Sequence, residues 1–163
     1  MIIKLSLSNM GDFKKSNQNF LEPYFKQYEK DDVDISYIDE QGKSIFLYYD
    51  ENDCVGQIKP CTNWNGYALI EDIAVAKDWR HKGIGTALLS KATEWAKQNN
   101  LVGLRLETQD VNVLACRFYA KNNFVIGGVD TMLYSNFPTS SKIKLIRKQS
   151  SVDQLRLAEL LII

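Results

Sequence analysis

A basic stretch with two glycines, Arg80-His81-Lys82-Gly83-Ile84-Gly85-Thr86, carries the residue types best suited to chemistry in this chain. It follows an apolar segment and opens an amphipathic one, which is typical of a loop that leads into a helix. Glycines let backbone N–H groups approach an anion closely, and a helix start adds unpaired donors and a positive dipole end. With the charges of Arg80 and Lys82, the stretch predicts a site for phosphate or pyrophosphate. It lacks the third glycine of a dinucleotide fingerprint and the Gly-Lys-Ser/Thr of a P-loop.

The segments before this loop predict antiparallel strands. Alternating or β-rich residues stand between turn signals, and Asn65-Gly66 is a strong hairpin signal. Residues 9–30 are expected to be partly helical and broken at Pro23. Strands are expected over residues 1–7, 34–39, 44–49, 54–59 and 67–75.

After the loop, the pattern changes to alternating helix and strand. Residues 83–99 predict a helix because their apolar residues recur on one stripe at helical spacing. The stripe consists of Leu88, Leu89, Ala92, Trp95 and Ala96. The following segments predict a strand over 101–107, a short helix over 112–121, and further strand over 124–128 and 131–134. The expected fold class is therefore α/β, with a central, mostly antiparallel mixed sheet flanked by helices.

The composition of the 163-residue chain predicts a single globular domain. Hydrophobic residues make up 45% and charged residues 25%, which excludes a wholly disordered chain, a collagen-like chain and a disulfide-rich miniprotein. The three cysteines lack CxxC spacing and there is one histidine, so we expect no metal site. We expect a cytoplasmic protein without a membrane partner, because neither a signal peptide nor a bilayer-spanning apolar run is evident.

The net charge of zero is unevenly distributed. Residues 1–75 hold 7 lysines and 13 acidic residues, whereas residues 76–163 hold 13 basic and 7 acidic residues. The acidic half could meet a cation and the basic half an anion, although compensated solvated surface accounts for the same counts. No long basic stripe with interleaved aromatic residues occurs, so we expect no nucleic-acid partner.

Arg80-x-x-Gly83-x-Gly85 after Ile73-Ala74-Val75 resembles the acetyl-CoA motif of the GNAT N-acetyltransferase family. A second block of that family resembles residues 106–124, through Ala115, Phe118 and Tyr119. Within the family, the chain is most similar to the streptothricin acetyltransferases. The similar segments are 21–24, 46–49, 63–65, 67–75, 106–110 and 129–134, so the resemblance covers about residues 21 to 137.

The resemblance implies an enzyme that transfers an acetyl group from acetyl-CoA, its cosubstrate, to an amine. Backbone groups of Ile73, Ala74 and Val75 would bind the pantetheine arm, and the Val75 N–H would polarise the thioester carbonyl. Asn112 would bond the same arm, and Tyr119 would lie near the sulfur and protonate the leaving thiolate. The pyrophosphate would be held by Arg80, His81, Lys82, Gly83, Ile84, Gly85 and Thr86, with His81 as a loop residue rather than a base.

An amine acceptor requires a base. A lysine-like ammonium has a pKa near about 10.4, so at pH 7 roughly 0.1% is free amine and a proton must be removed. Strand alternation places Glu71 and Asp72 on opposite faces, and we favour Glu71 as the base. Glu107 ends the next strand, where ligands of α/β sheets collect. A water chain is a further alternative, and each carboxylate could instead be a solvated charge at a strand end.

Streptothricin, the acceptor that the subgroup implies, is cationic. Tyr24, Tyr28, Asp31 and Asp32 could form an anionic aromatic wall for it, or the acidic run could be a solvated loop. Residues 1–137 are expected to form the acetyltransferase domain. Residues 138–163 are an atypical tail, because the subgroup would continue into an aromatic-rich last strand. The tail indicates a replaced last strand or a frameshift, with a substitute strand over 142–146 and a helix over 152–163.

Three functions stay open at this level. The first is acetylation of a primary amine of streptothricin by direct attack in a ternary complex, which would inactivate the antibiotic. The second is the same reaction on another polyamine or on a protein amine. The third is an inactive relic that binds acyl-CoA without turnover. Dimers are common in the family, so a homodimer is compatible with the resemblance.

Overall fold

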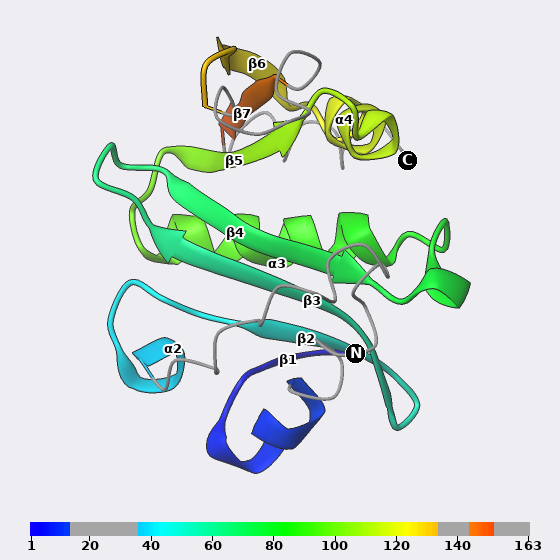
Figure 1. Ribbon diagram of the computed structural model, residues 1–163. Helices are drawn as coiled ribbons and strands as arrows, with labels where there is room; N and C mark the ends of the chain where they lie inside the picture. The colour runs from blue at the N-terminus through cyan, green and yellow to red at the C-terminus, as the bar shows by residue number, and fades with distance from the viewer. Residues whose placement is uncertain (14–35, 134–143, 152–163) are drawn as a thin grey trace, which may run out of the picture. The chain divides into compact units, whose positions relative to one another are not determined.

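The computed structural model describes residues 1–13, 36–133 and 144–151. These residues fall into two compact units (Figure 1). The first holds the described residues up to Thr62 together with Glu71–Ala92, and the second holds Asn63–Ile70 and the described residues from Thr93 onward. Hydrogen-bonded strands follow the order β1-β2-β3-β4-β5-β7-β6, with β4 parallel to β5 and β5 antiparallel to β7. The expected mixed sheet and α/β class are therefore confirmed.

The strands of the first unit are β1 (Ile2–Lys4), β2 (Phe46–Asp50), β3 (Asp53–Thr62) and the last part of β4 (Ala68–Val75). β1 pairs antiparallel with β2, and β2 with β3. The strands expected over 44–49, 54–59 and 67–75 correspond to β2, β3 and β4, which are neighbours in the strand order. Leu47 lies opposite Gln57, and Phe46 lies opposite Ile58. Because side chains alternate along a strand, Leu47 and Gln57 share one face and Phe46 and Ile58 share the other.

The two faces of this unit carry different partners. On the face of Leu47, a buried cluster consists of Leu5, Phe13, Tyr37, Ile45, Leu47 and Tyr49. On the opposite face lies α3 (Ile84–Gln98), of which residues 84–92 belong to this unit (Figure 1). A Cβ added at Gly56 would lie 3.1 Å from a methyl carbon of Ile84 and 3.2 Å from one of Leu88. This close approach explains why β3 has a glycine there. All five residues of the predicted α3 stripe are buried, which confirms the helical periodicity.

Ser44 offers a stability prediction in this unit. Its side chain is fully buried, and among the described residues its hydroxyl is the buried side-chain group for which no hydrogen-bond partner is found. A buried hydroxyl without a partner costs about 1–3 kcal/mol of desolvation. We therefore expect Ser44→Ala to raise the free energy of unfolding by about 1 kcal/mol, measured by urea denaturation. A loss of stability would contradict the absence of a partner.

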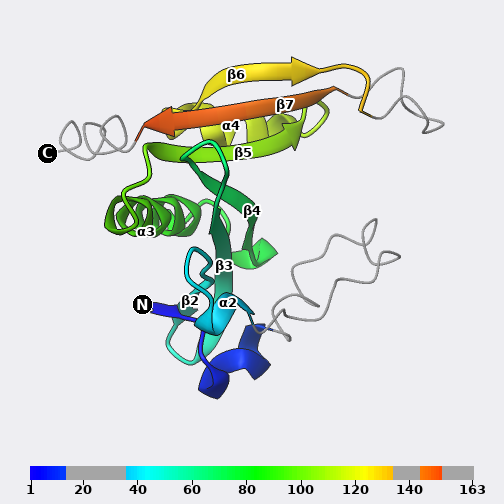
Figure 2. The same cartoon turned by 90° about the vertical axis from the view of Figure 1, so that its left-hand side faces the viewer.

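The second unit contains β5 (Gly103–Gln109), α4 (Val113–Lys121), β6 (Val125–Asp130) and β7 (Leu145–Ser151). β7 lies between β5 and β6 and is antiparallel to both (Figure 2). Lys148 lies opposite Leu106, and Ser150 lies opposite Leu104. All four of these residues are buried. A segment of the atypical tail therefore forms an interior strand of this unit.

Several expected elements differ from the structure. Residues 36–39, expected as strand, form the helical turn α2 (Ser36–Asp39), and residues 131–133 have no strand. The strand expected over 142–146 instead spans β7, because polar Lys148 and Ser150 occupy its buried face and hide the periodicity. Most of the 9–30 segment and the helix expected over 152–163 lie outside the described residues. Among the helices described, none is long and apolar enough to cross a membrane.

Candidate functional site

The glycine loop connects β4 to α3 by way of a short 3-10 turn, η3 (Lys77–Trp79). His81 has φ 63° and Gly83 has φ 80°, so the chain visits the left-handed region twice within three residues. Such a conformation favours glycine and is uncommon for other residues. The Arg80 Nε donates a hydrogen bond to the Val75 carbonyl at 3.1 Å, so the arginine side chain turns back to the end of β4.

The start of α3 presents backbone donors. Its first intrahelical bond runs from the Ala87 N–H to the Gly83 carbonyl at 3.0 Å. The N–H groups of Ile84, Gly85 and Thr86 precede that bond and belong to the donors that a helix start leaves unpaired. The loop before them is exposed, and the Lys82 ammonium lies 4.2 Å from the centroid of the Trp79 ring. The unpaired N–H groups and the positive dipole end of α3 therefore lie beside the basic side chains of the loop, where the sequence predicts a phosphate site.

Residues 73–75 of β4 differ from the start of that strand. The pairing of β4 with β5 covers Ala68 and Leu69 and stops before these residues. On the other side of β4, the Ala76 N–H donates to the Val55 carbonyl of β3 at 2.9 Å. Residues 73–75 are partly exposed. Their backbone can therefore accept a ligand that lies along β4 as a further strand would.

Glu71 lies in a cluster of polar side chains in the first unit. The Tyr37 hydroxyl donates a hydrogen bond to its carboxylate, and the Lys59 Nζ lies 3.6 Å from Oε2. The neighbouring Asp72 accepts a 2.6 Å hydrogen bond from Gln57 Nε2. Gln57 and Lys59 share one face of β3, so both carboxylates reach that face. The expectation that Glu71 and Asp72 lie on opposite faces is therefore wrong.

The Cys61 thiol lies near Glu71, and its ionisation can be tested. Burial, followed by the charge and hydrogen bond of Glu71, raises the pKa of the Cys61 thiol to about 11 from an ordinary 9.0. At pH 9 about 1% of Cys61 is then thiolate, against about half of an ordinary thiol. We expect iodoacetamide at pH 9 to alkylate Cys61 about 50-fold more slowly in the folded protein than in guanidinium, as peptide mass spectrometry would measure.

The same shift has a consequence for stability. The folded-state pKa is the higher one, so the contribution of Cys61 is fully present below pH 9 and is lost as pH rises toward 11. In Glu71→Gln the carboxylate no longer opposes ionisation, so Cys61 should react faster than in the unmodified protein. Equal rates in the two proteins would contradict the proximity of the thiol and the carboxylate.

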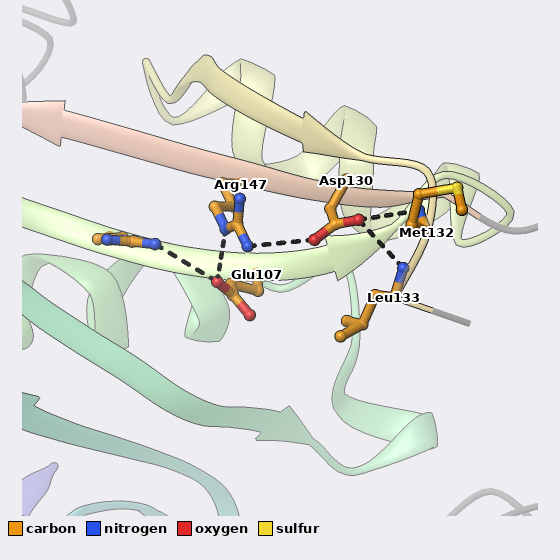
Figure 3. Close-up of polar contacts among 6 residues, drawn as sticks. Glu107, Asp130, Met132, Leu133 and Arg147 are labelled. Atoms are coloured by element: carbon orange, nitrogen blue, oxygen red, sulfur yellow. Dashed lines mark hydrogen bonds and ion pairs between the residues drawn. The ribbon is translucent and has the colours of Figure 1, made fainter. Parts of the chain in front are cut away.

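Glu107 in the second unit is held by arginines (Figure 3). Its Oε1 accepts from Arg147 Nε at 3.0 Å and from Arg105 Nη2 at 3.4 Å. Arg147 also lies 3.5 Å from Asp130. The Met132 backbone N–H, then that of Leu133 and the Arg147 charge, lower the pKa of Asp130. The network links β5, β7 and β6, and the central arginine comes from the atypical tail.

Asn112 and Tyr119 belong to α4. The Asn112 Oδ1 caps this helix by accepting the Ala115 N–H at 3.3 Å. Tyr119 is buried, with its ring centroid 5.3 Å from that of Phe118 and 5.7 Å from that of Phe124. Packing therefore fixes the Tyr119 ring, as positioning of a proton donor requires.

The structure thus groups the predicted residues within each unit. Glu71, residues 73–75 and the loop 80–86 lie in the first, and Glu107, Asn112 and Tyr119 lie in the second. The acceptor residues predicted from sequence lie outside the described residues; they are Tyr24, Tyr28, Asp31 and Asp32. Sequence analysis missed Tyr37, Lys59 and Arg147. Within the described ranges, no group of three or more His, Cys, Asp or Glu is placed to hold a metal ion.

Comparison with known proteins decides the family. Residues 13–124 match the model of the Acetyltransferase (GNAT) family, which is more than half of the chain. The chain belongs to the GNAT acetyltransferase family. This acetyltransferase is 57% identical to Streptothricin acetyltransferase A of Bacillus subtilis (strain 168), over 89% of this chain and 96% of the relative. It is 37% identical to the Streptothricin acetyltransferase of Escherichia coli, over 86% and 76% of the two chains.

A solved structure agrees with the fold of this acetyltransferase. It is a Bacillus anthracis str. Ames protein in complex with acetyl coenzyme A, with 32% identity and a TM-score of 0.78. The match covers 93% of this chain and 96% of that one. The expected N-acetyltransferase class is therefore confirmed, while the roles of individual site residues stay predictions.

Proposed function

We propose that this acetyltransferase transfers the acetyl group of acetyl-CoA to a primary amine of streptothricin in a ternary complex. The observation that carries the proposal is the 57% identity, over nearly the full length of both chains, to Streptothricin acetyltransferase A. The acetyl coenzyme A bound to the Bacillus anthracis protein supports the choice of acetyl donor. The product would be an acetylated, inactivated antibiotic.

Residues of the first unit fit the acetyl donor. Ile84, Gly85 and Thr86 would direct their N–H groups to the pyrophosphate, and Arg80, His81, Lys82 and Gly83 would complete the loop around it. Ile73 and Ala74 would bond the pantetheine arm. Asn112 has its Oδ1 engaged as a helix cap, so its Nδ2 is the atom that would donate to this arm.

The reaction needs charge stabilisation and two proton transfers. The amine nitrogen attacks the thioester carbonyl carbon, so a C–N bond forms while the C–S bond breaks. The Val75 N–H would donate to the carbonyl oxygen as negative charge develops there. The ammonium first gives one proton to a base. The second N–H proton, lost as the amide forms, balances the proton that Tyr119 would give to the departing sulfur.

The contacts of the two carboxylates favour Glu71 over Glu107 as the base. Two guanidinium groups donate to Glu107 Oε1, so that oxygen is already engaged by two charged donors. Glu71 accepts from the neutral Tyr37 hydroxyl, and among the described residues Lys59 is the cation beside it, at 3.6 Å. A water chain from the amine to either carboxylate remains the alternative route.

The atypical tail no longer favours the inactive relic over the enzyme. From the sequence, the tail favoured an inactive relic because the last strand of the sheet would be missing. Residues 145–151 form β7 between β5 and β6, so that argument loses its basis. Acetylation of another polyamine or of a protein amine stays the closest alternative, because it needs the same donor site.

The decisive experiment measures thiol release from acetyl-CoA by the purified protein, with and without streptothricin. We expect release that depends on streptothricin, with one acetyl group added to the antibiotic by mass spectrometry. Thermal protection by acetyl-CoA without release would contradict the acceptor and point to another amine. The absence of both release and protection would contradict the donor as well.

A further inference from the structure

An aromatic ring, a carboxylate and an ammonium group meet in the first unit. The Lys59 Nζ lies 4.1 Å from the centroid of the Tyr37 ring and 3.6 Å from Glu71 Oε2. The Tyr37 hydroxyl donates to that same carboxylate. The three residues come from α2, β3 and β4, so the fold brings them together. An ammonium between an aromatic face and a carboxylate is the arrangement with which proteins bind cationic amines.

The exposure of the three groups shows which of them can move. Tyr37 is only 5% exposed and belongs to the buried cluster, so its ring is fixed. The side chains of Lys59 and Glu71 are 30% and 33% exposed. A lysine ammonium is strongly hydrated and sits on a flexible stem, so Lys59 can leave the ring for water. Another ammonium could then take the place of Lys59 over the ring and beside the carboxylate.

A second lysine near the same ring provides a contrast. The Lys43 Nζ lies 5.4 Å from the Tyr37 centroid, farther than that of Lys59. It also lies 3.0 Å from Glu40 Oε2, its own carboxylate. Of the two, Lys59 is therefore the lysine that lies both over the Tyr37 ring and beside the Glu71 carboxylate.

We propose that Tyr37 and Glu71 form a subsite for an ammonium group of the acceptor, and that Lys59 is its resident occupant, which the acceptor displaces. This rests on the proposed function, because it requires a cationic amine as the acceptor. The exchange replaces one ammonium by another, so no charge is left buried and unpaired. The bound amine then lies against the carboxylate that we favour as the base.

If Lys59 occupies the subsite, the acceptor should bind more weakly than it would to an empty subsite. When a site is open for only a fraction of the time, the apparent dissociation constant rises by the inverse of that fraction. If Lys59 occupies the subsite for roughly 70–90% of the time, removing its ammonium should strengthen binding about three- to tenfold. The turnover number at saturation should stay unchanged, because saturating acceptor has already displaced Lys59.

The test compares the unmodified protein with Lys59→Met, Lys59→Arg and Lys43→Met. Steady-state thiol release gives KM for streptothricin and kcat, and calorimetry without acetyl-CoA gives Kd. We expect Lys59→Met to lower KM and Kd about three- to tenfold with kcat within about twofold. Lys59→Arg keeps a cation at the ring, and Lys43→Met removes the same charge from a neighbouring position. Lys43→Met should leave KM and Kd within about twofold, and Lys59→Arg should not lower them, because a guanidinium stacks on the ring and pairs with the carboxylate at least as well as an ammonium.

Unchanged or raised KM and Kd in Lys59→Met would overturn the proposal, and an equal fall in Lys43→Met would do the same by indicating a general field effect. Lys59→Gln replaces Lys59→Met if melting temperatures show that the latter is destabilised. An unmodified protein that binds acetyl-CoA but neither binds nor acetylates streptothricin would overturn the proposed function and the subsite together. Streptothricin acetylation with the same KM in every variant would overturn the subsite alone.

Discussion

Gly103→Ala is expected to lower the free energy of unfolding by about 3 kcal/mol, the upper end of the range for overpacked sites. A Cβ at this position would lie 1.9 Å from the Ser150 carbonyl oxygen and 2.9 Å from the Ser151 Cα. These are backbone atoms of β7, so they cannot rotate away as a side chain would. In a chain of 163 residues the melting temperature should fall by roughly 6–12 °C, which calorimetry would measure.

Gly11→Ala is the matched control, because nothing lies within 4 Å of the Cβ it would add. It should be neutral or slightly stabilising, since alanine loses less backbone entropy than glycine on folding. The pair tests the placement of the tail. The three atoms nearest to the Cβ added at Gly103 all belong to Ser150 and Ser151 of β7, so a neutral Gly103→Ala would mean that residues 145–151 do not pair with β5.

The sequence pattern predicted helices and strands correctly where the buried face of the element is apolar throughout. The α3 stripe repeats Leu88, Leu89 and Ala92 at helical spacing, and all three are buried. The Asn65-Gly66 signal is matched by a turn in which Gly66 has φ 81°. The strand expected over 142–146 overlaps only the start of β7, because the buried positions farther along β7 include Lys148 and Ser150. These polar residues are buried because β7 pairs with β5 on one side and with β6 on the other. The residues of β7 by themselves do not indicate those partners.

One part of the candidate site could be predicted from the sequence and another part could not. The loop at Arg80 could be found from sequence because its glycines, charges and helix start are contiguous. The cluster of Tyr37, Lys59 and Glu71 could not, because 34 residues separate Tyr37 from Glu71 and the fold alone unites them. The sequence held only a weak signal for this cluster. Lys59 is two residues after Gln57 on the same strand, so it shares a face with that buried residue. A polar residue on a buried strand face indicates a partner without indicating which one.

Tyr119→Phe is expected to lower kcat about 100- to 1000-fold while leaving the affinity for acetyl-CoA unchanged. General acid catalysis typically contributes about 10²–10⁴-fold, and the lower part applies because a thiolate leaves without strong need of a proton. Phenylalanine keeps the ring that packs at 5.3 Å from Phe118 and 5.7 Å from Phe124. Alanine would instead open a cavity between those rings, so a loss of folding could be mistaken for a loss of chemistry.

Tyr49→Phe is the control for removing a buried tyrosine hydroxyl. That hydroxyl donates to Asp12 Oδ2 at 2.8 Å, and burial together with this carboxylate raises the pKa of Tyr49. Its loss should cost about 1–3 kcal/mol of stability and leave kcat unchanged, because it belongs to the buried cluster of the first unit. Thiol-release kinetics and acetyl-CoA titration would separate the two variants. A Tyr119→Phe protein with full kcat would show that the ring serves packing and that the departing sulfur takes its proton from water.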